Sequence, residues 1–139
     1  MGKGRCLREA ATPEVAVLSF GPIGNIVADA IEAIAAQGAA APVPADRIGH
    51  YDLRFAKPLD EAMILDVARR YRRLIIVEDG VRQGGIGSAV LELLADRGVS
   101  VPVVRLGLPD QFVEHGTVAQ LQHICGIDCE AITKAITES

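Results

Sequence analysis

Polar and titratable side chains gather where the predicted strands of this chain end. In an open parallel sheet, ligand clefts form outside the carboxyl ends of the strands. The predicted strand ends carry acids, bases and a hydroxyl, namely Ser19, Arg54, Lys57, Glu78, Asp79, Asp110, Glu114 and His115. This edge could be a ligand cleft, but ion-pair networks also gather charges without catalysing anything. We expect it to be a domain interface or to face an active site.

His115 is the candidate for acid–base chemistry, because a histidine titrates near neutral pH. Glu114 or Asp110 could orient its ring. Glu78 and Asp79 could bind a divalent cation if further oxygen ligands came close. The sequence has neither a Ser-His-Asp order nor a nucleophile elbow. Since a lone loop histidine is more often structural or interfacial, and nothing in the sequence guarantees further oxygen ligands beside Glu78 and Asp79, we predict no catalytic or metal-binding residue in this chain.

A glycine-rich turn, Gly84–Ser88, opens a predicted helix after a strand. Its backbone N–H groups and the helix dipole could hold a phosphate. A dinucleotide fingerprint needs a third small residue, but Val90 stands at that position, and no Walker lysine follows. We interpret the glycines as permitting a tight turn and close helix–sheet contact. A free-standing phosphate-binding module remains an alternative.

The composition argues against several kinds of partner and site. The 139 residues carry a formal net charge of -4, which offers no attraction for nucleic acid or an anionic membrane. The basic segment Arg69–Arg73 falls at the end of a predicted helix, where cations complement the dipole, so we expect it to be solvated. No long apolar run or signal peptide occurs, which predicts a cytoplasmic protein. The sparse cysteines, Cys6, Cys125 and Cys129, predict reduced thiols and, even with His123 nearby, no zinc site.

Short apolar runs alternate with helical periodicity along the chain. The apolar runs predict strands over residues 14–20, 48–55, 74–77 and 101–106. The predicted helices bury four stripes, which are Ile26, Val27, Ala30, Ile31 and Ile34; Ile64, Val67, Ala68 and Tyr71; Val90, Leu91, Leu94 and Ala95; and Ile132 and Ile136. The expected boundaries are caps at Asp60 and Asp128, a capping box from Thr117 to Gln120, and stops at Gly38 and Gly98.

This alternation predicts an α/β protein with three αβα layers. The sheet should be mainly parallel with about five strands, because buried strands joined through helices form parallel sheets. Residues 5–8 could add an antiparallel edge strand, and residues 39–45 should be a connector too small to pack as an element. We expect residues 1–139 to form one domain.

Three segments resemble the last domain of 1-deoxy-D-xylulose-5-phosphate synthases, which is a transketolase C-terminal-like domain. They are Asp52–Asp60 with its RF-x-KPLD pattern, Glu78–Gly80 with Gln83–Val90, and Gly107–Gly116 with its GLPD-x-F-x-EHG pattern. The resemblance extends to residues 2–5 and 126–128 and so covers nearly the whole chain. Other transketolases and the beta subunits of 2-oxoacid dehydrogenases share the glycine-rich turn, and they are the alternative families.

The resemblance implies a homodimeric parent enzyme that condenses pyruvate with D-glyceraldehyde 3-phosphate, releases carbon dioxide and serves isoprenoid and thiamine synthesis. In that family thiamine diphosphate and Mg²⁺ are held by a G-D-G motif with an asparagine downstream. Here Asp79-Gly80 lacks the preceding glycine, and the only asparagine is Asn25. The resemblance therefore implies that N-terminal and central domains of the same enzyme bind the cofactor, and that this chain alone is inactive.

Overall fold

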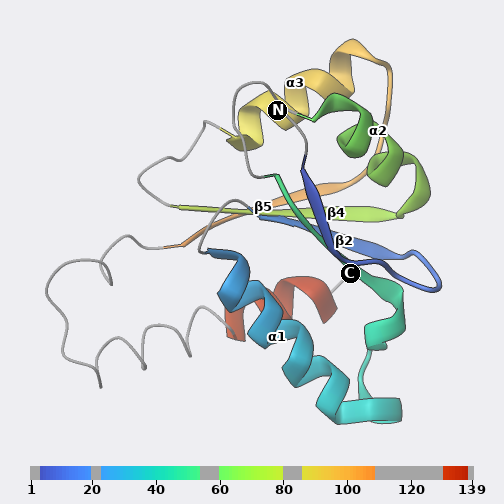
Figure 1. Cartoon of the computed structure of the whole chain (residues 1–139), viewed down its shortest axis with the longest axis vertical. Coiled ribbons are helices and arrows are strands. Elements are labelled where there is room, and N and C mark those ends of the chain that lie inside the picture. Colours follow the sequence, from blue (N-terminus) through green and yellow to red (C-terminus); the bar gives the residue numbers. More distant parts are fainter. Residues whose placement is uncertain (1–3, 20–22, 54–59, 80–85, 109–129, 138–139) are drawn as a thin grey trace, which may run out of the picture.

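The computed structural model describes residues 4–19, 23–53, 60–79, 86–108 and 130–137 (Figure 1). Its strands are β1 (Arg5–Arg8), β2 (Val15–Ser19), β3 (Ile48–Asp52), β4 (Arg73–Asp79) and β5 (Val103–Leu108). Its helices are α1 (Ile23–Gln37), α2 (Glu61–Arg70), α3 (Ile86–Asp96) and a further helix over residues 130–137, with 3-10 turns η1 (Gly38–Ala40) and η2 (Ala45–Arg47).

The five strands form one sheet in the order β1-β3-β2-β4-β5. Strands β3, β2, β4 and β5 pair in parallel, whereas β1 pairs with β3 antiparallel at the edge. Figure 1 shows α1 and the helix over 130–137 on one side of this sheet and α2 and α3 on the other. These observations confirm the predicted three-layer αβα class and the antiparallel edge strand.

Each face of the sheet carries its own apolar core, because side chains alternate along a strand. On the α1 face, Val17 and Ile75 pack against Ile34 and Ile132. On the α2/α3 face, Leu18 and Ile76 pack with Ile64, Leu94 and their neighbours. All five residues of β2 are buried, as expected of a central strand covered on both sides.

The predicted helix boundaries agree with the structure where it describes them. The Asp60 side chain accepts a 3.1 Å hydrogen bond from the Met63 N–H and so caps α2. Gly38 and Gly98 have φ angles of 56° and 67°, the left-handed conformation that ends helices at glycine. The predicted Asp128 cap and the capping box from Thr117 to Gln120 lie outside the described residues.

Three predictions of packing were wrong in detail. In α3, Leu91 is 37% exposed and Ala95 is exposed, because the buried stripe runs through Leu93 and Leu94. The connector over 39–45 contributes to the core, since Val43 is buried with the α1-face cluster.

The basic segment is only partly solvated. Arg70 bonds the Glu9, Asp66 and Tyr51 side chains, at 3.0, 2.9 and 3.2 Å. Arg73 donates to two carbonyl oxygens near the end of the helix over 130–137, each at 2.6 Å. These carbonyls have no partner within their own helix, so Arg73 ties that helix to the start of β4.

No helix among the described residues is both long and apolar enough to cross a membrane.

Candidate functional site

The carboxyl ends of the parallel strands meet at one edge of the sheet, as the sequence predicts. Ser19 at the end of β2 pairs in register with Asp52 at the end of β3. Strands β4 and β5 extend two residues further, where Glu78 and Asp79 pair with Gly107 and Leu108. The backbone therefore places the ends of four strands together, which is the usual position of a ligand crevice in such folds.

The structure locates only part of the predicted site at this edge. Glu78 and Asp79 occupy the last two positions of β4, and the structure describes their backbone but not their side chains. The other candidates, Arg54, Lys57, Asp110, Glu114 and His115, lie outside the described residues. Gly84 and Gly85 of the glycine-rich turn also lie outside them, whereas Gly87 and Ser88 belong to the first turn of α3. The proposed role of the edge therefore stays a prediction.

A buried Ser-His pair lies beside this edge and was not predicted. The Ser19 Oγ and His50 Nε2 atoms are 2.8 Å apart, and Ser19 and His50 are 0% and 2% exposed. Gly24 in the first turn of α1 lies against the pair, because a Cβ there would be 3.2 Å from Ser19 Oγ. The first turn of α1 therefore packs closely against the pair.

The electrostatics of this pair argue against nucleophilic catalysis. Burial lowers the pKa of His50 to about 4, although the carboxylate of Asp52 acts in the opposite direction. A histidine with so low a pKa is neutral and weakly basic at pH 7. The fully buried Ser19 hydroxyl cannot meet a substrate in this arrangement. We interpret the pair as two buried polar groups that satisfy one another.

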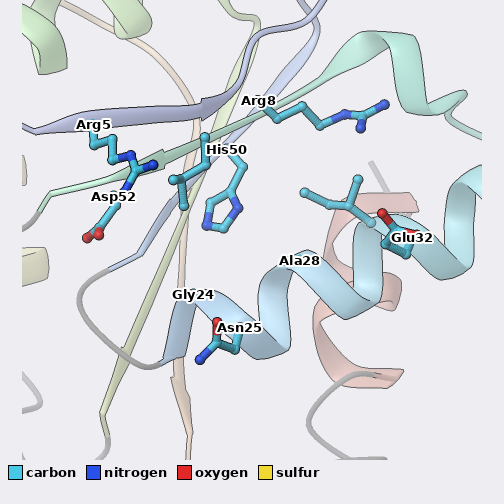
Figure 2. Close-up of a pocket in the computed structure, with 10 residues that line it drawn as sticks. Arg5, Arg8, Gly24, Asn25, Ala28, Glu32, His50 and Asp52 are labelled. Atoms are coloured by element: carbon cyan, nitrogen blue, oxygen red, sulfur yellow. The ribbon is translucent and has the colours of Figure 1, made fainter.

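A cavity of about 410 Å³ opens next to His50, between β1, β3 and α1 (Figure 2). Its described lining combines charged and apolar side chains, which are Arg5, Leu7, Arg8, Gly24, Asn25, Ala28, Ile31, Glu32, His50 and Asp52. The volume lies within the range typical of small-molecule sites. Three separate elements shape it, so the cavity depends on the tertiary fold.

A polar network on the opposite face holds the segment after β1. The Tyr51 and Tyr71 hydroxyl oxygens are 2.9 Å apart, and the rings meet edge to face. The Ala10 N–H donates to the Tyr71 hydroxyl at 3.1 Å. Burial, together with the hydrogen bond to Tyr71, raises the pKa of Tyr51 well above its ordinary value. Each buried hydroxyl in this network has a protein partner.

Two signals in the sequence could have located the missed groups. In a strand over 48–52, alternate residues share a face, so His50 must lie on the same buried face as Ile48. The antiparallel edge strand was predicted, and it carries Arg5 and Arg8, although regular alternation would assign the two arginines to opposite faces. The cavity itself left no local signal, because it forms between segments far apart in sequence.

Comparison with known proteins identifies the family. The model of the family described as "Transketolase, C-terminal domain" matches residues 2–132. The chain belongs to this family. It is 45% identical over 139 residues to a 1-deoxy-D-xylulose-5-phosphate synthase from Bacteroides fragilis, of which it spans 20%. It is 40% identical over 136 residues to the synthase from Syntrophotalea carbinolica, again covering 20% of that protein.

The fold also matches a solved transketolase chain. The structure titled "Split gene transketolase, inactive beta4 tetramer" superposes with a TM-score of 0.74 at 24% identity, over 99% of this chain and 42% of that one. At this identity the match supports the transketolase C-terminal fold alone. The chain thus corresponds to about one fifth of the synthases that it matches.

Within the described residues, no group of three or more His, Cys, Asp or Glu side chains converges as a metal site would require.

Proposed function

We propose that this chain is the C-terminal domain of a thiamine-diphosphate-dependent 1-deoxy-D-xylulose-5-phosphate synthase. The observation that carries the proposal is 45% identity over the whole chain to a protein of that name. The whole enzyme condenses pyruvate with D-glyceraldehyde 3-phosphate and releases carbon dioxide in the cytoplasm. The role of this domain is to support the catalytic domains and the homodimer.

The donor atoms of this chain do not fit the cofactor. Thiamine diphosphate with Mg²⁺ needs oxygen donors close together, which in this family come from a G-D-G motif and an asparagine. The only asparagine, Asn25, lies in α1 beside the cavity. Asp79 precedes a glycine but follows Glu78 in place of one. The cofactor is therefore held by other domains in our proposal.

The carboxyl edge of the sheet is the surface through which this domain would act. The parallel register gathers the ends of β2, β3, β4 and β5 there. Glu78 and the predicted edge residue His115 would then contact neighbouring domains. An edge rich in both signs of charge suits an interface within one enzyme, because complementary charges fix orientation.

Complementation tests this proposal directly. A synthase truncated before its own copy of this domain is mixed with the chain, pyruvate, glyceraldehyde 3-phosphate, thiamine diphosphate and Mg²⁺. We expect the mixture to make 1-deoxy-D-xylulose 5-phosphate and the truncated enzyme alone to make far less. A chain that binds the truncated enzyme without restoring product would contradict the supporting role.

Variants of the chain then test the edge. Glu78→Ala combined with His115→Ala should weaken the restored activity at limiting chain concentration. Glu92→Ala is the matched control, because Glu92 is exposed on α3 away from the edge. If the double variant restores activity as well as Glu92→Ala does, the edge is not the docking surface.

Docking of the chain to a separate partner subunit in place of self-association would instead favour the alternative that it belongs to a 2-oxoacid dehydrogenase beta subunit.

A further inference from the structure

We propose that the cavity between β1, β3 and α1 binds a small organic anion that also carries hydroxyl groups. A phosphate or carboxylate would be held by the Arg5 guanidinium, Arg8 would add positive charge further along the cavity, and the hydroxyls would meet the acceptors on the other walls. This proposal is independent of the role of the domain in a larger enzyme.

An irregularity in β1 places both arginines on the cavity face. Arg5 and Arg8 are three positions apart, so in a regular strand they would point to opposite faces. In this strand Arg5 pairs with Asp52 and Arg8 pairs with His50, because the register shifts between Cys6 and Arg8 and leaves Leu7 extra. Asp52 and His50 share a face, so their partners do too. Such bulges often re-aim side chains beside functional sites.

The two guanidinium groups differ in how they are held. Arg8 donates from Nε and Nη2 to the Ala45 carbonyl oxygen, at 3.4 and 3.2 Å, and its guanidinium extends away from His50 (Figure 2). The Arg5 guanidinium has no hydrogen-bond or ion-pair partner within the described ranges of the chain. Figure 2 shows the two side chains on either side of His50. Guanidinium groups suit oxyanions because their N–H groups can bond two oxygens at once.

The other walls supply acceptors and an incompletely bonded histidine. Asn25 and Glu32 come from α1, and Asp52 comes from β3. His50 lines the cavity and uses Nε2 for Ser19, while its Nδ1 has no hydrogen-bond partner within the part of the chain that the structure describes. Carboxylate and amide oxygens accept hydrogen bonds from hydroxyl groups. This mixed lining favours a hydroxylated anion over a bare inorganic ion.

The cavity can be tested on the chain alone by nuclear magnetic resonance. Glycerol 3-phosphate is titrated into ¹⁵N-labelled chain at constant ionic strength, with inorganic phosphate and glycerol as separate probes. We expect glycerol 3-phosphate to shift the amide signals of Gly24, Asn25 and His50 and to bind more tightly than either probe. Equal binding of inorganic phosphate, or shifts confined to other residues, would overturn the proposal, as would the absence of saturable binding.

Two kinds of variant distinguish the effect of the Arg5 charge on binding from the effect of the free volume of the cavity. Arg5→Gln should weaken binding about tenfold or more, because a charge-assisted bond to the anion is lost. Ala28→Leu keeps every charge but fills the cavity from an exposed position of α1, and it should weaken binding similarly. Arg69→Gln, which removes one exposed positive charge from α2 on the other face, is the matched control.

Two results with these variants would refute the site. If Arg69→Gln weakens binding as much as Arg5→Gln does, the anion is attracted by general charge and the site is refuted. If Ala28→Leu binds like the unchanged chain, the ligand lies elsewhere. Because no other domain is present in this experiment, its failure leaves the complementation result unaffected.

Discussion

The buried polar groups on the two faces of the sheet differ in how completely they are hydrogen-bonded. On the α2/α3 face, the hydroxyls of Tyr51 and Tyr71 bond to each other, and Ala10 and Arg70 complete the network. On the α1 face, His50 bonds only Ser19 within the described residues and borders a cavity of about 410 Å³. A fully bonded network fixes the packing around it, whereas a partly bonded group beside a space leaves capacity for a ligand. The comparison indicates that the α1 face is the one suited to binding.

Replacing a glycine by alanine on each face should give the largest difference in stability between the two faces. A Cβ at Gly49 would overlap the Tyr71 hydroxyl and ring carbon, so Gly49→Ala must displace the tyrosine network. We expect it to lower the free energy of unfolding by about 3 kcal/mol, the upper end of the usual cost of overpacking. Gly24→Ala meets Ser19 Oγ at 3.2 Å and His50 at 3.7 Å, and replacing a helical glycine offsets part of that contact.

Urea unfolding of the two variants measures this contrast. Gly24→Ala should change the free energy of unfolding by less than about 1 kcal/mol, since the helical gain of the substitution opposes the tighter contact. If the two variants are equally destabilised, the faces do not differ in packing as the structure indicates.

Acidification should affect the α1 face through His50. The pKa of His50 is lowered to about 4 in the folded chain, against about 6.5 when unfolded. The unfolded state therefore takes up a proton first, so stability is complete above pH 6.5 and falls as the pH drops from 6.5 toward 4. The loss by pH 4.5 should be about 2 kcal/mol.

A variant at His50 separates the effect of this histidine on acid stability from the effect of the carboxylates. His50→Gln keeps an amide that can bond Ser19 but cannot titrate. Unfolding by urea at pH 7 and pH 4.5 should show a smaller loss on acidification for His50→Gln than for the unchanged chain. Equal losses in the two proteins would mean that His50 is not the buried neutral group described.

Removing one hydroxyl from the α2/α3 face should have the smallest effect of the three. Tyr71→Phe leaves the buried Ala10 N–H without its acceptor and takes one partner from Tyr51. We expect a loss of about 1.5 kcal/mol, within the usual cost of an unsatisfied buried donor. Amide hydrogen exchange at Ala10 should accelerate in Tyr71→Phe and stay slow in Tyr51→Phe. Unchanged exchange in both variants would argue against the hydrogen bond from Ala10 to Tyr71 that holds this segment.

Much of the fold was predictable from local pattern. The strand cores, the Asp60 cap and the two glycine stops follow from side-chain chemistry within a few residues. The buried stripe of α3 was misplaced because Leu91 and Leu93 are equally apolar, and only the sheet beneath decides which is covered. Val43 was missed because burial in a connector depends on what lies opposite.

The candidate site was predictable only in outline. A parallel sheet by itself implies that the strand ends converge. The contacts among Ser19, His50 and Gly24 could not be predicted, because they depend on distances between separate elements. The spacing of Arg5 and Arg8 is misleading in itself, since regular alternation assigns them to opposite faces. The pairing of β1 with β3 determines which face each arginine occupies, and the sequence of β1 alone does not encode that pairing.

The extra residue in β1 also affects how related sequences should be aligned. If Leu7 were absent, ordinary alternation in a regular strand would bring Arg8 opposite His50. A regular strand with Arg-x-Arg spacing and a bulged strand with Arg-x-x-Arg spacing therefore present the same surface. A regular strand that keeps Leu7 would instead place Arg8 on the face away from the cavity. Relatives that differ by one residue here can therefore share a binding surface, while relatives with the same arginine spacing can lack it.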